Sequence, residues 1–102
     1  MKLEHYSEEK LKKEILEIVG KHLDLKKYKV FFFGSRVKRN NFPRADIDIG
    51  IEGPKEISGT VISEIKERID MLPTLYKFDI VDFKTVSEKF NKEAKKHKEY
   101  VK

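Results

Sequence analysis

Two aspartates near the middle of the chain, Asp46 and Asp48, have the type and spacing of metal ligands. They alternate with isoleucines in the stretch ADIDIGIE, residues 45–52. Because successive side chains of a strand point to opposite faces, this pattern predicts a strand with its isoleucines in the core and both aspartates on the other face. Two neighbouring carboxylates repel each other unless a cation binds them, and Mg²⁺ prefers such oxygen ligands.

A third carboxylate stands on a later predicted strand, YKFDIVDF, residues 76–83. Asp79 shares one face of this strand with Val81, whereas Asp82 lies on the opposite face. If this strand lies beside the strand of Asp46, Asp79 completes a three-carboxylate site, and Asp82 is the residue that could replace it. Three such carboxylates can hold two metal ions about 4 Å apart, which promotes phosphoryl transfer.

The turn before the aspartate strand has the features of a phosphate site. Gly34 allows a ligand to approach the backbone closely, and Ser35 supplies a hydroxyl where a strand meets a helical turn, whose free N–H groups bind anions. The basic residues around this turn are Arg36, Lys38, Arg39 and Arg44. Arg36 and Lys38 are predicted to bind nucleotide phosphates, although solvated surface charge is an equal alternative for both.

Apolar periodicity predicts the elements that position these groups. They are a helix over residues 7–23, a central strand over 28–33, the aspartate strand over 45–52, a helix over 58–71, the strand over 76–83 and a basic helix over 85–101. Residues 36–45 are polar and rich in turn formers. This order predicts an α+β fold, a small mixed β-sheet of three or more strands with helices packed on it.

Length and composition limit the remaining possibilities. A chain of 102 residues has room for one domain with a modest core, so we expect a single domain over residues 1–102. No apolar run approaches the roughly 18 residues of a membrane span, so we expect a soluble, cytoplasmic protein without a membrane partner. The absence of cysteine excludes thiolate metal sites. A net charge of +5 suits an anionic partner, and lysine-rich helix faces would give the same total.

Together these residues resemble the signature of the DNA polymerase β-like nucleotidyltransferase superfamily. Gly34-Ser35 is followed by ten residues and then by Asp46-Ile47-Asp48. The small size and the strand FDIVDF are most similar to its minimal nucleotidyltransferase (MNT) branch. Two departures stand out. Arg36-Val37-Lys38-Arg39 lacks the glycine that many relatives carry there, and the chain ends on a predicted helix where many relatives continue into a short strand.

The resemblance implies a polymerase β-like nucleotidyltransferase fold and a set of residue roles. Asp46 and Asp48 would hold two Mg²⁺ ions on a nucleoside triphosphate, and Gly34 with Ser35 would grip its phosphates. Asp79 would ligate the catalytic metal and help to activate the attacking hydroxyl. The implied catalytic and metal-binding residues are therefore Asp46, Asp48 and Asp79.

The resemblance also implies a biological role. Known members of the MNT branch are antitoxins paired with helical HEPN ribonuclease toxins, to which they transfer AMP from ATP, typically on a tyrosine. It thus implies a protein adenylyltransferase with ATP as substrate and a HEPN toxin as partner in a hetero-oligomer. The basic run Lys95–Lys98 has no interleaved aromatic residues, so we expect no direct nucleic-acid binding.

Two alternatives remain open at this point. The chain could be a non-catalytic module that masks a toxin sterically. It could also be a nucleotidyltransferase subunit that acts on a small molecule or an RNA end together with a separate helical chain.

Overall fold

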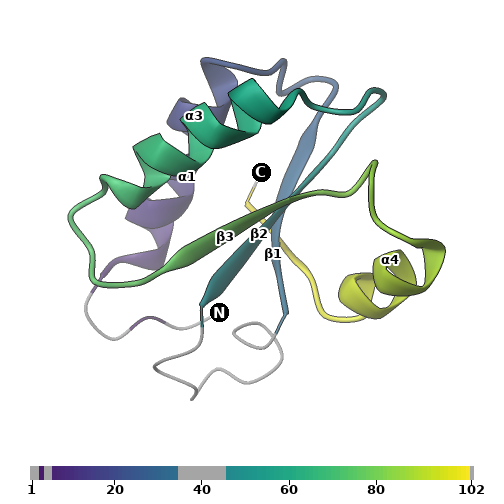
Figure 1. The fold of residues 1–102 in the computed structure, drawn as a ribbon. Coiled ribbons are helices and arrows are strands. Elements are labelled where there is room, and N and C mark those ends of the chain that lie inside the picture. The colour runs from purple at the N-terminus through teal and green to yellow at the C-terminus, as the bar shows by residue number, and fades with distance from the viewer. Residues whose placement is uncertain (1–2, 4–5, 35–45, 102) are drawn as a thin grey trace.

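The computed structural model describes residues 3, 6–34 and 46–101 (Figure 1). In chain order its elements are α1 (Glu8–Gly20), β1 (Lys29–Phe33), β2 (Ile47–Glu52), α3 (Gly59–Asp70), β3 (Phe78–Asp82), α4 (Glu88–Lys95) and β4 (Glu99–Tyr100). The four strands form one sheet in the order β3-β2-β1-β4. β1 is antiparallel to β2 and β4, whereas β2 is parallel to β3. The mixed sheet, and the central position expected for the first strand, are confirmed.

The two faces of the sheet carry different helices. α1 and α3 cover one face, and α4 lies over the other (Figure 1). The alternating isoleucines Ile47, Ile49 and Ile51 are fully buried in the larger core beneath α1 and α3. The α4 face carries a smaller aromatic cluster of Phe31, Phe33 and Phe83. The period of two in residues 47–51 therefore leaves the aspartate face free of the main core.

The aromatic cluster depends on a glycine in β2. A Cβ at Gly50 would lie 2.5 Å from Cε2 of Phe31 and 2.6 Å from Cε1 of Phe83. Real Cβ atoms do not approach rings this closely, so only glycine lets the two rings lie on the strand. The rings of Phe31 and Phe83 pack edge to face, with centroids 4.8 Å apart.

Serine caps define where the three helices begin. Ser7, Ser58 and Ser87 each accept a hydrogen bond from a backbone N–H of the first turn of α1, α3 and α4. α1 ends at Gly20, slightly before the predicted end at residue 23, and the chain continues in a turn. Within the described residues, no helix is both long and apolar enough to cross a membrane.

The C-terminal segment differs from the sequence prediction. A single basic helix was expected over residues 85–101, without a further strand, and this expectation is wrong. α4 ends at Lys95, and β4 then pairs with β1, aligning Tyr100 with Phe31. The N–H of Val101 donates to the carbonyl of Val30 at 2.9 Å, and the Val101 side chain is buried. The segment becomes extended because it satisfies backbone groups at the edge of β1, which a helix would leave unpaired.

Candidate functional site

The centre of the candidate site is one row of residues across three strands. Phe33 of β1 pairs with Asp48 of β2, and Asp48 pairs in turn with Asp79 of β3. Side chains of directly paired residues lie on the same face, and neighbouring strands are about 4.8 Å apart. The structure thus brings Asp48 and Asp79 side by side on the face opposite the main core, as expected if the two strands were neighbours.

Gly34 approaches this row from the end of β1. Its φ angle is +84°, the left-handed region that favours glycine. A Cβ at residue 34 would lie 2.1 Å from Oδ2 of Asp48, which is closer than any real contact. The Asp48 carboxylate therefore occupies the space that a side chain at residue 34 would fill, and the backbone of Gly34 lies directly against it. A ligand bound by this carboxylate would lie close to that backbone.

The electrostatics of Asp48 are those of a cation-binding group. Burial and, to a smaller extent, the charges of Asp79 and Asp46 raise the pKa of Asp48 to about 6. The carboxylate pays a desolvation cost and two repulsions that a hard divalent cation would reverse. The paired carboxylates of Asp48 and Asp79 are oxygen donors of the kind that fit a Mg²⁺ ion.

Asp46 lies close enough to Asp48 for its charge to contribute to the raised pKa of Asp48. It is exposed, directly before β2, and lines a neighbouring hollow of about 450 Å³. The hollow is lined by Asp46, Lys66, Asp70, Tyr76, Lys77 and Phe78. In the described part of the chain, no three acidic or histidine side chains are gathered closely enough to hold a metal ion. The structure brings two of the three predicted carboxylates together, and the three-carboxylate site stays a prediction.

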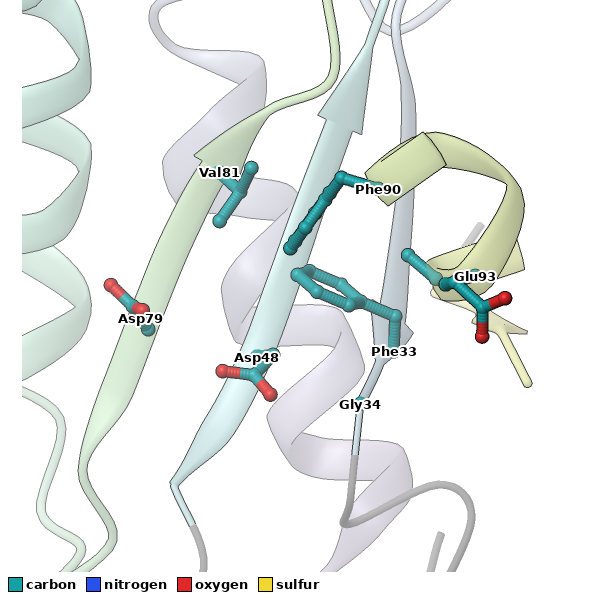
Figure 2. A pocket seen from close by; sticks show the side chains of 8 residues that line it. Phe33, Gly34, Asp48, Asp79, Val81, Phe90 and Glu93 are labelled. Atoms are coloured by element: carbon teal, nitrogen blue, oxygen red, sulfur yellow. The ribbon is translucent and has the colours of Figure 1, made fainter. Parts of the chain in front are cut away.

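Asp48 and Asp79 belong to a pocket of about 400 Å³, which we call the carboxylate pocket (Figure 2). Its lining residues are Phe33, Gly34, Asp48, Asp79, Val81, Phe90, Glu93 and Ala94. Gly34 and the two aspartates form its polar end. The other end, which we call the apolar wall, consists of Phe33, Val81, Phe90 and Ala94. Figure 2 shows the rings of Phe33 and Phe90 close together beyond the carboxylate of Asp48.

Several residues predicted to take part lie outside the described residues. They are Ser35, Arg36, Lys38, Arg39 and Arg44. Of the four predicted nucleotide-binding residues, the structure therefore describes Gly34 alone.

Asp82, considered in the sequence as a replacement for Asp79, is a structural residue. Its Oδ2 accepts the N–H of Ile57 at 2.8 Å, and its Oδ1 accepts the N–H of Lys84 at 3.0 Å. These bonds hold two connections of the chain against the end of β3. Asp82 does not line the carboxylate pocket.

Sequence reasoning did not assign the apolar wall to the site. In the sequence, Phe90 and Ala94 follow Val86 at four-residue steps, which indicates only the packed face of a helix. The same spacing places Phe90 and Ala94 over the aspartate face of the sheet once α4 is known to lie there. That placement, which the periodicity cannot give, was the missing information.

Comparison with known proteins places the geometry in a family. A family model described as "Polymerase beta, Nucleotidyltransferase" matches residues 13–102. A chain from a structure of tri-AMPylated Shewanella oneidensis HEPN toxin in complex with MNT antitoxin is similar with a TM-score of 0.72 and 15% identity, covering 94% of this chain and 72% of that one. A chain from a toxin–antitoxin structure with AMP-PNP is similar with a TM-score of 0.72 and 16% identity, covering 89% of this chain and 72% of that one. No curated protein sequence matches the chain. At these identities the structural likeness shows a shared fold.

Proposed function

This chain belongs to the polymerase β nucleotidyltransferase family, and we propose that it is a Mg²⁺-dependent protein adenylyltransferase that moves AMP from ATP to a hydroxyl of a HEPN toxin, and so acts as an antitoxin. The observation that carries the proposal is the pairing of Asp48 with Asp79 in the carboxylate pocket, with the backbone of Gly34 against the Asp48 carboxylate. Two structures that share its fold are toxin–antitoxin complexes, one with an AMPylated HEPN toxin and one with AMP-PNP.

The roles of the residues follow from their chemistry. Asp46, Asp48 and Asp79 would hold Mg²⁺, which supplies positive charge to the triphosphate and to the developing negative charge. The backbone of Gly34 would approach phosphate oxygens beside Asp48, and Ser35, Arg36 and Lys38 would contact the phosphates. Asp79 would help to activate the acceptor hydroxyl, whose oxygen bonds to the α-phosphorus while the bond to pyrophosphate breaks. The protein contributes position and charge, the main sources of catalysis in phosphoryl transfer.

The position of Asp79 supports a macromolecular acceptor. Asp79 is exposed and stands on β3, the edge strand of the sheet. Asp48, one strand further in, is half-buried. An acceptor on the surface of another protein could therefore reach Asp79 from the open edge, while the triphosphate lies over Asp48. A tyrosine of the toxin is the acceptor that we propose.

The test is a transfer assay with a HEPN toxin as the acceptor. The two proteins are incubated with α-labelled ATP and Mg²⁺, and the toxin is examined by intact mass spectrometry and peptide mapping. We expect one or more AMP units on a tyrosine, lost in Asp48→Asn and Asp79→Asn. Asp24→Asn is the matched control, because exposed Asp24 only caps a turn by accepting the N–H of Lys26 at 2.9 Å.

Other outcomes would favour a different function. A stable complex that neutralises the toxin equally well with Asp48→Asn, without any gain in mass, would show steric masking. Label that appears on RNA or on a small molecule, and not on the toxin, would show a different acceptor class.

A further inference from the structure

Phe90 is a partly exposed aromatic residue at the mouth of the carboxylate pocket. It is 42% exposed, although its ring contacts two buried rings of the aromatic cluster. Its centroid lies 6.1 Å from that of Phe33 and 5.9 Å from that of Phe83. One side of the ring is thus supported by the core of this face, and the rest remains available to a flat ligand.

The helix that carries Phe90 is capped by a serine at its start and tied to the sheet near its end. At its start, Ser87 accepts the N–H of Phe90 at 3.1 Å. Near its end, Nζ of Lys95 contacts Oε2 of Glu52 in β2 at 2.8 Å. No side chain of α4 is buried, so the helix contributes little to the main core. Its contacts instead fix the ring of Phe90 relative to Asp48.

The apolar wall is electrically neutral on the side that faces the carboxylates. Glu93, the other lining residue from α4, has its Oε1 paired with Nζ of Lys96 at 3.1 Å. In Figure 2 its carboxylate points away from Asp48 and Asp79. Charged groups therefore gather at one end of the pocket and an uncharged, aromatic surface forms the other. A nucleotide has the same division, with charged phosphates at one end and a flat base at the other.

We propose that the apolar wall holds the nucleobase of the bound nucleoside triphosphate, with the base stacked on Phe90. This inference rests on the proposed function and adds the part of the site that binds the base. A volume of about 400 Å³ falls within the range of small-ligand sites. The wall could instead receive the aromatic ring of an acceptor tyrosine. An acceptor tyrosine would also be positioned by its own protein. The base of free ATP can be positioned by this chain alone, so it has the greater need for an apolar surface here.

Stacking also sets the expected base preference. Every base has a flat face, so stacking does not separate adenine from guanine, and the larger purine ring covers more of Phe90 than a pyrimidine does. We therefore expect ATP and GTP to bind more tightly than UTP.

The test compares nucleotide binding with binding of the phosphates alone, in the absence of any acceptor protein. Dissociation constants of ATP and of inorganic tripolyphosphate are measured with Mg²⁺ by calorimetry for the whole chain and its variants. In Phe90→Ala we expect ATP to bind about tenfold more weakly or worse and tripolyphosphate to bind unchanged, since stacking of one base is worth that much. Phe90→Trp keeps an aromatic ring at residue 90 and should therefore bind ATP about as tightly as the wild type.

Tyr100→Ala is the matched control. Tyr100 is 44% exposed and its ring packs on Phe31 of the same cluster, 6.2 Å away, but it does not line the pocket. It should leave both dissociation constants unchanged. Melting temperatures of all variants show that each is folded during the measurement.

Two results would overturn the inference, and they can be told apart. If wild-type protein binds ATP and Phe90→Ala binds it equally well, the base does not lie on Phe90 and the proposed function stands. Loss of AMP transfer in that variant, with ATP binding intact, would then assign Phe90 to the acceptor. If the wild-type protein binds neither ATP nor tripolyphosphate, the proposed function fails, and this inference fails with it.

Discussion

The backbone of Gly34 lies so close to the Asp48 carboxylate that a Cβ at residue 34 would stand 2.1 Å from Oδ2. Gly34 directly follows β1, whereas Asp48 lies in β2, and Gly34 adopts a φ of +84° where the two meet. The position of the Asp48 carboxylate thus depends on the absence of a side chain at residue 34.

Gly34→Ala should therefore damage both the fold and the site. The positive φ alone costs a residue with a Cβ about 1–2 kcal/mol, and the contact with Asp48 adds to that cost. We expect a lower free energy of unfolding in urea and loss of Mg²⁺-dependent ATP binding. The matched control is Gly59→Ala at the start of α3, where no atom lies within 4 Å of the added Cβ. Unchanged ATP affinity in Gly34→Ala would contradict a ligand at this position.

The raised pKa of Asp48 predicts a pH dependence of stability in the metal-free protein. The folded pKa of about 6 exceeds the ordinary value of 3.8. The folded state thus binds the proton more tightly than the unfolded state. The protonated Asp48 therefore contributes to the free energy of unfolding in full below about pH 4, and this contribution is lost as the pH rises through about 6. In EDTA, stability should fall over this window.

Asp48→Asn should remove that dependence and stabilise the metal-free protein at pH 7. After discounting for solvent screening at this half-buried site, we expect a gain of about 1 kcal/mol. Urea unfolding at several pH values measures it, with exposed Glu56→Gln as a control that should follow the wild type. Added Mg²⁺ should raise the melting temperature of the wild type and leave that of Asp48→Asn unchanged. A less stable Asp48→Asn would argue against the repulsion described for this site.

Asp79 and Asp82 should separate catalysis from folding. The two carboxylate oxygens of Asp82 accept the N–H groups of Ile57 and Lys84. Asparagine has only one such oxygen, so in Asp82→Asn one of the two N–H groups would face the amide NH₂, which is also a donor. We expect the free energy of unfolding to fall by about 1–3 kcal/mol. The remaining folded protein should bind Mg²⁺ and ATP normally. Asp79→Asn should do the opposite, with stability retained and AMP transfer lost. Loss of transfer in a fully folded Asp82→Asn would restore Asp82 as a site candidate.

The sequence was sufficient for the strand that carries Asp48, because isoleucine occupies every second position over residues 47–51. Ile47, Ile49 and Ile51 can face the core in one register only, and that register sends Asp48 to the other face. The partnership of Asp48 with Asp79 was conditional in the sequence, since no local signal states which strands are neighbours. The structure met that condition.

The end of the chain could not be predicted in the same way. Residues 85–101 are rich in lysine and glutamate, which favour helix, and helical spacing continues through Ala94. The short strand at Glu99–Tyr100 arises from hydrogen bonds with Phe31 and Phe32, more than sixty residues earlier in the chain. The one local signal was the aromatic and β-branched pair Tyr100-Val101 after the lysine run.

The row of Phe33, Asp48 and Asp79 has a consequence for how such a site can change. Its members are separated by the spacing of hydrogen-bonded strands, about 4.8 Å. The backbone pairing therefore sets the distance between the two carboxylates. Loops between the strands can lengthen or shorten without altering it. A single residue inserted within β2 ahead of Asp48 would turn that aspartate into the isoleucine core and place a neighbour over the pocket. The pair of carboxylates would then be lost, although both aspartates would still be present in the sequence.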